Sequence, residues 1–244
     1  MTDSSLRQQR TEARRLQILE AARVQADAEG WAAVTTRHLA DAIGYSQPVL
    51  YGHFAGGKAE IMLAVALAGF DELAQLCRDA LGRKQGRAAA EAVATAYLTF
   101  GTQHPAVYEA MFQQPIAARF ASEHTEPELR AGFDVLAESI GDRDAGTSTE
   151  VFWGALHGLC LLERSARVLV EQRPLRVAEL ASRFVVEGPI AQKSNSGRAA
   201  TSVAPRSTRL ARSRHSSRDV GFDESLVDVR RRIHSRTERR RVLQ

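Results

Sequence analysis

The side chains that could carry out catalysis are few and scattered in this sequence of 244 residues. The histidines His104, His124 and His157 have no catalytic or metal-binding partner at a regular spacing. The cysteines Cys77 and Cys160 lie far apart, which favours two buried apolar side chains over a disulfide or a metal pair. No glycine-rich phosphate loop, nucleophile elbow or metal-ligand cluster is present. We therefore expect no catalytic residue, no metal, no cofactor and no enzyme activity.

Polar and aromatic side chains gather instead in residues 35–58, which read TTRHLADAIGYSQPVLYGHFAGGK. The pattern predicts two short helices joined by a tight turn. The paired threonines can cap the first helix, and Gly44 can end it because glycine adopts the left-handed conformation at little cost. Ser46 can cap the second helix, with Pro48 in its first turn. A short helix that begins with polar groups suits the DNA major groove.

The segments TTRHLA and GYSQPVLYGHF, followed by Lys58, resemble the DNA-binding domain of the tetracycline-repressor (TetR) family. The resemblance covers about Leu16 to Leu67. Three residues separate Phe54 from Lys58, where the family usually has two. The resemblance implies a three-helix helix-turn-helix domain that binds double-stranded DNA. The alternative is a helical hairpin inside an unrelated all-helical protein.

The side chains of this motif divide into base contacts and phosphate contacts. Gln47 is the best candidate for a base edge, because its amide can donate and accept together. Pro48 and Val49 could touch thymine methyl groups, and His53 could reach DNA or pack beneath the helix. Phosphate contacts are expected from Thr36, Arg37, Tyr51 and Lys58. The full DNA-binding set is Thr36, Arg37, Ser46, Gln47, Pro48, Val49, Tyr51, His53 and Lys58.

Helical periodicity continues to about residue 190, and no alternating stretch or hairpin signal interrupts it, so we expect an all-α fold. A long helix over 59–81 should join the two domains. Proline opens helices at positions 105, 127 and 174, and Thr147 with Glu150 forms a capping-box signal. The expected organisation is a disordered arm over 1–11, a helix-turn-helix domain over 12–58, a helical regulatory and dimerisation domain over 59–190, and a disordered basic tail over 191–244.

Charge separates the tail from the rest of the chain. Residues 191–244 hold 14 Lys and Arg against 5 Asp and Glu, whereas residues 1–190 hold 19 against 24. The tail has almost no large apolar groups in its first half and cannot offset the entropy of ordering. It is either a solvated appendage or an electrostatic anchor to a polyanion. The basic residues of the arm leave the same two readings open, a solvated end or a segment lying near DNA.

The stretch Trp153-Gly154-Ala155-Leu156-His157-Gly158 and the upstream HPAVYEAMF resemble one group of TetR-family C-terminal domains. Gly154 and Gly158 share a stripe on a very apolar helix, so a second helix could approach closely. With the final helix it could form a four-helix bundle across a two-fold axis, as the family does. We expect a homodimer; the alternative is the core helix of a monomeric domain.

The second domain also carries an aromatic set with few charges. Such side chains, spread over four helices, could line a cavity for a small, largely apolar effector of unknown identity. The competing interpretation is a closed core. The expected ligand-binding residues are Tyr97, Phe100, His104, Tyr108, Met111, Phe112, Phe133, Trp153 and His157.

These features predict a ligand-responsive transcriptional regulator, a repressor that binds a near-palindromic operator as a homodimer. The second hypothesis is a helical small-molecule-binding or catalytic protein with a vestigial helix-turn-helix. No apolar run reaches membrane-spanning length, and the N-terminus lacks a secretory signal, so we expect a cytoplasmic protein without a membrane partner.

Overall fold

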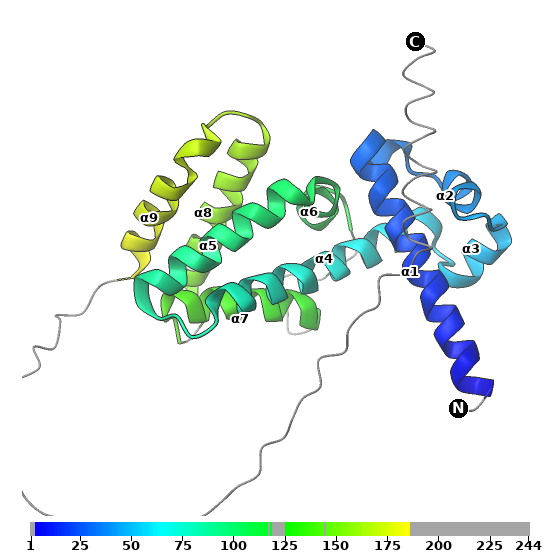
Figure 1. Cartoon of the computed structure of the whole chain (residues 1–244), viewed down its shortest axis with the longest axis horizontal. Helices are drawn as coiled ribbons and strands as arrows, with labels where there is room; N and C mark the ends of the chain where they lie inside the picture. Colours follow the sequence, from blue (N-terminus) through cyan, green and yellow to red (C-terminus); the bar gives the residue numbers. More distant parts are fainter. Residues whose placement is uncertain (1–2, 117, 119–124, 144, 186–244) are drawn as a thin grey trace, which may run out of the picture.

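Figure 1 shows a computed structural model of the chain, which describes residues 3–116, 118, 125–143 and 145–185. Every regular element in these residues is helical, which confirms the predicted all-α class. The tail lies outside the described residues. In chain order the elements are α1 (Asp3–Glu29), η1 (Trp31–Ala33), α2 (Thr36–Ile43), α3 (Gln47–His53), α4 (Gly57–Leu81), α5 (Gly86–Gln103), α6 (Pro105–Phe112), α7 (Pro127–Ile140), α8 (Thr147–Arg164), η2 (Val170–Gln172) and α9 (Arg173–Phe184).

The first helix is longer than the sequence pattern indicated. It begins at Asp3, so the disordered arm expected over 1–11 is wrong for residues 3–11. The segment is polar on all sides, but no glycine or proline interrupts it, and Leu, Arg, Gln, Glu and Ala are strong helix formers. In Figure 1 the first turns of α1 extend beyond α2 and α3.

A small core holds α1, α2 and α3 together. Ile18 from α1, Leu39 from α2, and Leu50 with Phe54 from α3 and its end are completely buried. Leu50 and Phe54 lie four residues apart, which places both on the inner side of α3. This core fixes the outer faces of the two short helices relative to one another.

Helix α4 runs from the first domain into the second, where α5, α6 and α7 pack against it (Figure 1). Gly69 marks the closest approach: a Cβ atom there would lie 2.4 Å from Val107 Cγ1 and 2.8 Å from Met111 Sδ. Only a glycine lets α6 lie this close to α4, so the two helices are held in one register.

Helix α8 begins with a cap that the sequence pattern did not predict. The Oδ2 atom of Asp142 accepts from the backbone N–H groups of Gly146 and Thr149, and also from the Thr149 hydroxyl at 2.7 Å. Gly146, not Thr147, is the cap residue, and it makes no side-chain bond. The capping box expected from Thr147 and Glu150 is therefore wrong, because a carboxylate from the preceding loop satisfies the free amides.

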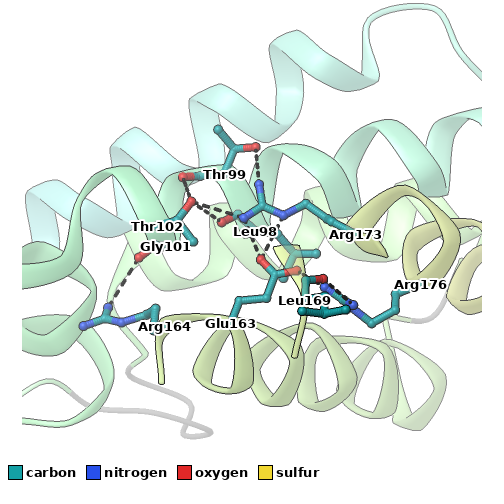
Figure 2. A network of polar contacts seen from close by, with 9 residues as sticks. All are labelled: Leu98, Thr99, Gly101, Thr102, Glu163, Arg164, Leu169, Arg173 and Arg176. Atoms are coloured by element: carbon teal, nitrogen blue, oxygen red, sulfur yellow. Dashed lines mark hydrogen bonds and ion pairs between the residues drawn. The ribbon is translucent and has the colours of Figure 1, made fainter. Parts of the chain in front are cut away.

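A buried ion cluster joins α8 to α9, as Figure 2 shows. The side chain of Glu163 is fully buried and accepts from Arg173 at 2.6 Å and from Arg176 at 2.7 Å. Arg173 also reaches the hydroxyls of Thr99 and Thr102 on α5. Burial alone would raise the pKa of Glu163, but the bonds from the two arginines outweigh it and lower the pKa. The cluster fixes the angle of α9 against α8.

Neither a membrane span nor a metal cluster is found in the part of the chain that the structure describes. None of its helices combines the length and apolarity needed to cross a bilayer. No group of three or more histidine, cysteine, aspartate or glutamate side chains among these residues converges as metal ligands would.

Candidate DNA-binding surface and ligand cavity

The two motif helices begin and end where the sequence predicted. The hydroxyl of Thr35 accepts from the His38 amide at 3.1 Å, and Gly44 ends α2 in the left-handed conformation with a φ of 74°. Ser46 occupies the cap position of α3, although its side chain makes no capping bond, and Pro48 lies in the first turn. Thr35 therefore fixes the start of α2, and Gly44 sets the turn between the two helices.

The outer face of α3 is polar and open to solvent. Ser46, Gln47, Pro48 and Val49 are exposed at its start, and Tyr51 is 46% exposed one turn later. Because Leu50 is completely buried, the helix turns these five side chains outward together. A protruding helix start of this kind can enter a major groove.

The expected phosphate contacts of α2 lie beside the same face. Arg37 is exposed, and Thr36 is half-buried with its hydroxyl 3.5 Å from that of Tyr51. Gly57, one of the three residues between Phe54 and Lys58, has a φ of +60°, and a Cβ there would lie 3.3 Å from the Tyr51 ring. Glycine accommodates the longer connection without displacing Tyr51.

One side chain of the expected DNA-binding set is engaged inside the domain, and the backbone of another member is bonded there. Lys58 is half-buried, and its Nζ donates to the Trp31 carbonyl oxygen at 2.5 Å. His53 is half-buried, and its carbonyl oxygen accepts from Arg15 at 3.4 Å. The Arg15 guanidinium also lies 4.4 Å from the centre of the Phe54 ring. Sequence reasoning missed this arginine, which fastens the end of α3 to α1.

The first domain is joined to the second by side-chain contacts at three points. Trp31 Nε1 donates to the Ala106 carbonyl at 2.8 Å, and the Ala106 amide donates to Asp27 Oδ1 at 3.0 Å. Arg23 pairs with Glu72 on α4 through two bonds. The helix-turn-helix unit is thus held both to α4 and to the first turn of α6.

A cavity of about 310 Å³ opens between α4, α5, α6, α7 and α8. Four of the expected ligand-binding residues line it: Tyr97, Phe112, Phe133 and Trp153. The rest of its wall is mostly apolar and includes Phe70, Leu73, Ala74 and Cys77 from α4 and Leu129, Val135 and Leu136 from α7. Sequence reasoning assigned the helix over 59–81 only the role of joining the two domains, and missed its residues as part of the cavity wall.

The other five expected residues lie elsewhere in the second domain. Phe100 is buried with its ring 5.0 Å from that of the exposed His104. Met111 packs against α4 at Gly69. Tyr108 is completely buried and bonded to His157 Nδ1 at 2.7 Å, behind the wall of the cavity.

The outer faces of α8 and α9 form an apolar groove. A Cβ atom added at Gly154 or Gly158 would meet no atom within 4 Å, so this side of α8 is open. Large apolar side chains flank the opening, with Val151 57% and Leu175 71% exposed. The groove is lined by Ala155, Gly158, Leu159, Leu162, Gln172, Leu175, Arg176, Glu179, Leu180 and Arg183.

The fold is similar to that of several solved structures, while no curated protein matches the chain. A protein of unknown function from Rhodococcus sp. RHA1 is 20% identical, with a TM-score of 0.59 over 71% of this chain and 95% of that chain. The protein SCO4313 is 19% identical, with a TM-score of 0.59 over 72% and 97%. A regulatory protein of the TetR family from Rhodococcus RHA1 is 19% identical over 69% and 95%, with a TM-score of 0.48. The first two likenesses show a shared fold.

Family models cover both domains. The model of bacterial regulatory proteins of the TetR family matches residues 18–65, which contain α2, α3 and the start of α4. The model of a tetracycline-repressor-like C-terminal domain matches residues 90–187, which contain most of the residues that line the cavity and the α8–α9 groove. The chain therefore belongs to the TetR family of helix-turn-helix, DNA-binding transcriptional regulators.

Proposed function

We propose that this protein is a ligand-responsive repressor that binds a near-palindromic operator as a homodimer and leaves it when a small molecule fills the cavity. The observation that carries the proposal is the outer face of α3, where Gln47, Pro48 and Val49 protrude while Leu50 and Phe54 anchor the helix from beneath. The proposal includes no catalytic activity, no metal and no cofactor.

Operator recognition would divide between α2 and α3. Gln47 is placed to read a base edge, because its amide offers a donor and an acceptor side by side. Arg37, exposed on α2, and Tyr51, exposed on α3, would hold phosphates, which would make binding salt-dependent. Lys58 would have to give up its bond to the Trp31 carbonyl to reach a phosphate, so its contribution should be smaller than that of Arg37.

Dimerisation would use the apolar groove between α8 and α9. Exposed apolar patches of this kind mark interaction sites on soluble proteins. The open stripe at Gly154 and Gly158 admits a facing helix, and the buried Glu163 cluster keeps the two helices at a fixed angle (Figure 2). A two-fold axis through this face would present two α3 helices to half-sites one helical turn or slightly more apart.

Effector binding would reach the DNA-binding domain through α6. Its last residue, Phe112, lines the cavity, and its first turn is held by Trp31 and Asp27 through Ala106. Gly69 keeps α6 tight against α4, so a ligand that displaces Phe112 must move α6, α4 or both. Either movement shifts α3 and favours a state that does not bind DNA.

The test is a titration of an operator obtained by selection from random duplexes, with and without small apolar molecules. Compounds that raise the melting temperature of the protein should weaken operator affinity, and the operator should weaken their binding by the same factor. Ligands that stabilise the protein at the cavity and leave operator affinity unchanged would contradict the proposed ligand response.

A further inference from the structure

Four side chains form a continuous hydrogen-bonded chain from the cavity wall into the second domain. Trp153 Nε1 lies 3.1 Å from the Tyr97 hydroxyl, which lies 3.2 Å from the Tyr108 hydroxyl. The Tyr108 hydroxyl lies 2.7 Å from His157 Nδ1. Tyr97 and Trp153 line the cavity, whereas Tyr108 is completely buried behind them. Both partners of the bond between Trp153 and Tyr97 are therefore residues of the cavity wall.

The chemistry of the two ends sets the direction of the hydrogen bonds. An indole N–H can only donate, so the Tyr97 oxygen accepts from Trp153. At the other end, burial and then the nearby Arg164 guanidinium lower the pKa of His157, which keeps its ring neutral at neutral pH. With the proton of the neutral ring assigned to Nε2, Nδ1 accepts from the Tyr108 hydroxyl, and Tyr108 in turn accepts from Tyr97. The Tyr97 proton is thereby occupied, and what the hydroxyl can still offer is a lone pair on oxygen.

The remainder of the cavity offers few competing polar groups. The charged residues Arg130, Asp134 and Glu150 that border it are exposed. Burial raises the pKa of the Cys77 thiol to about 12, so that group stays neutral and bonds weakly. Phe70, Phe112 and other apolar side chains supply most of the wall. A volume near 310 Å³ lies at the small end of ligand pockets.

We propose that the cavity selects small, uncharged, aromatic molecules whose polar group donates a hydrogen bond to the Tyr97 oxygen, with His157 as the residue that fixes this preference through Tyr108. The proposal rests on the cavity's being the ligand site of the proposed function. It narrows the ligand class from apolar molecules in general to those with a donor.

The same geometry makes the preference dependent on pH. The groups that face His157 are Tyr108 and Phe112 from α6 and Arg164 on its own helix. A protonated His157 would donate from Nδ1 to Tyr108, whose hydroxyl would then donate to the Tyr97 oxygen. The Tyr97 proton would become free for a ligand acceptor. Because the pKa of His157 lies below its ordinary value, this reversal requires pH well below about 6.5.

The test is calorimetric titration of the full chain with three bicyclic molecules of similar size. Indole donates a hydrogen bond, benzofuran has the same shape without the donor, and quinoline only accepts. At neutral pH we expect indole to bind about tenfold more tightly than benzofuran, the value of one buried hydrogen bond. As the pH falls below about 6.5 and His157 becomes protonated, the preference for indole over benzofuran should decrease, with no substitution in the protein.

Two variants separate the proposed roles from a loss of folding. Tyr97→Phe should bring indole and benzofuran to equal affinity. His157→Phe keeps an aromatic ring but removes the acceptor, so it should strengthen quinoline binding relative to indole at neutral pH. A merely structural role for His157 would weaken all three ligands alike. Each variant is first compared with the wild type by its helical circular dichroism and melting temperature.

Equal affinity of indole and benzofuran for the wild-type protein would overturn the proposal, and so would failure of all three to bind at millimolar concentration. The effect of a ligand on operator affinity is measured separately from its affinity for the cavity, so the two proposals can fail independently. Donor-selective binding that leaves operator affinity unchanged would support this inference and contradict the proposed ligand response. If molecules without a hydrogen-bond donor release the operator and indole is not preferred, the proposed ligand response would be supported and the donor preference contradicted.

Discussion

The indole N–H of Trp31 donates a 2.8 Å hydrogen bond to the carbonyl oxygen of Ala106, which joins the DNA-binding domain to the first turn of α6. The amide of the same alanine donates to Asp27 Oδ1 at 3.0 Å. First-turn amides have no partner within their own helix, and a carboxylate is favourable near the positive end of the helix dipole. Asp27 therefore caps a helix of the other domain, and one residue of α6 is held by both of its backbone groups.

Removing either contact should weaken the connection between the domains. We expect Trp31→Phe to lower the free energy of unfolding by about 2 kcal/mol, through the lost bond and the smaller ring, and Asp27→Ala by about 1 kcal/mol. Since both side chains hold Ala106, the double variant should deviate from additivity by at least about 0.5 kcal/mol. Denaturant unfolding measures this. The control is a second double-mutant cycle that combines Trp31→Phe with the distant Arg183→Ala, where the two losses should add. If the losses also add for Trp31→Phe and Asp27→Ala, the two side chains do not hold Ala106 together.

The reading helix yields a prediction about base discrimination. Gln47 is exposed at the start of α3, so Gln47→Ala should cost about 1–3 kcal/mol of discrimination at one base position per half-site. Arg37→Ala is the matched control. It should weaken binding to all duplexes alike, because it removes a phosphate contact. The slope of the logarithm of the binding constant against the logarithm of salt concentration should become shallower by about 1. Binding to selected and random duplexes at several salt concentrations separates the two. If Gln47→Ala weakens both duplexes equally, the base contact is assigned wrongly.

The ion cluster of Figure 2 predicts a dependence of stability on pH. Because the folded state holds the pKa of Glu163 below its ordinary value of 4.5, this group contributes stability that is fully present above that value. The contribution is lost as the pH falls from 4.5 through the lower, folded-state pKa. The free energy of unfolding of the wild type should fall as the pH is lowered across this range. In Glu163→Gln the free energy of unfolding should depend less steeply on pH.

The same variant should be costly at neutral pH as well. Glu163→Gln leaves Arg173 and Arg176 without their carboxylate in a buried setting, which typically costs about 3–5 kcal/mol. Glu179→Gln breaks the exposed pair with Arg183 on the same helix and should cost less than about 0.5 kcal/mol. Similar losses for the two variants would show that the buried cluster does not stabilise the α8–α9 pair.

The groove on α8 predicts a loss of dimer without a loss of fold. Gly158→Leu meets no atom of its own chain within 4 Å of the new Cβ, so the monomer should keep its stability or gain about 0.5–1 kcal/mol in helix propensity. A facing helix would be displaced, and sedimentation at low concentration should show monomers. Gly101→Ala is the contrast: its Cβ would lie 2.2 Å from Cys160 Sγ, so it should destabilise the fold. A Gly158→Leu protein that stays fully dimeric would place the interface elsewhere.

Local signals in the sequence predicted most helix boundaries, and tertiary contacts explain what those signals missed. Thr35, Gly44 and Pro105 act through their own backbone neighbours, so their roles can be read from adjacent residues. Asp142 caps α8 from a loop, and Arg15 fastens the end of α3 from another helix. Such pairs have no fixed spacing along the chain, so no sequence pattern reveals them.

The ligand cavity was predicted only in part for the same reason. Aromatic composition identified Tyr97, Phe112 and Trp153, but composition cannot separate wall from core. Tyr108 belongs to the same aromatic set, and it lies behind the wall because α6 approaches α4 closely at Gly69. That approach depends on a helix pairing, which the sequence does not display.

Selection of bound sequences from random duplexes is the direct test of whether the protein binds a near-palindromic operator as a dimer. The full-length protein is incubated with the pool, bound duplexes are recovered and amplified, and the enriched sequences are compared with those recovered by Gln47→Ala. We expect a motif of two half-sites related by a two-fold axis and about one helical turn apart, with one position in each half-site relaxed by the variant. Enrichment of no motif, or of a single half-site unaffected by Gln47→Ala, would contradict it.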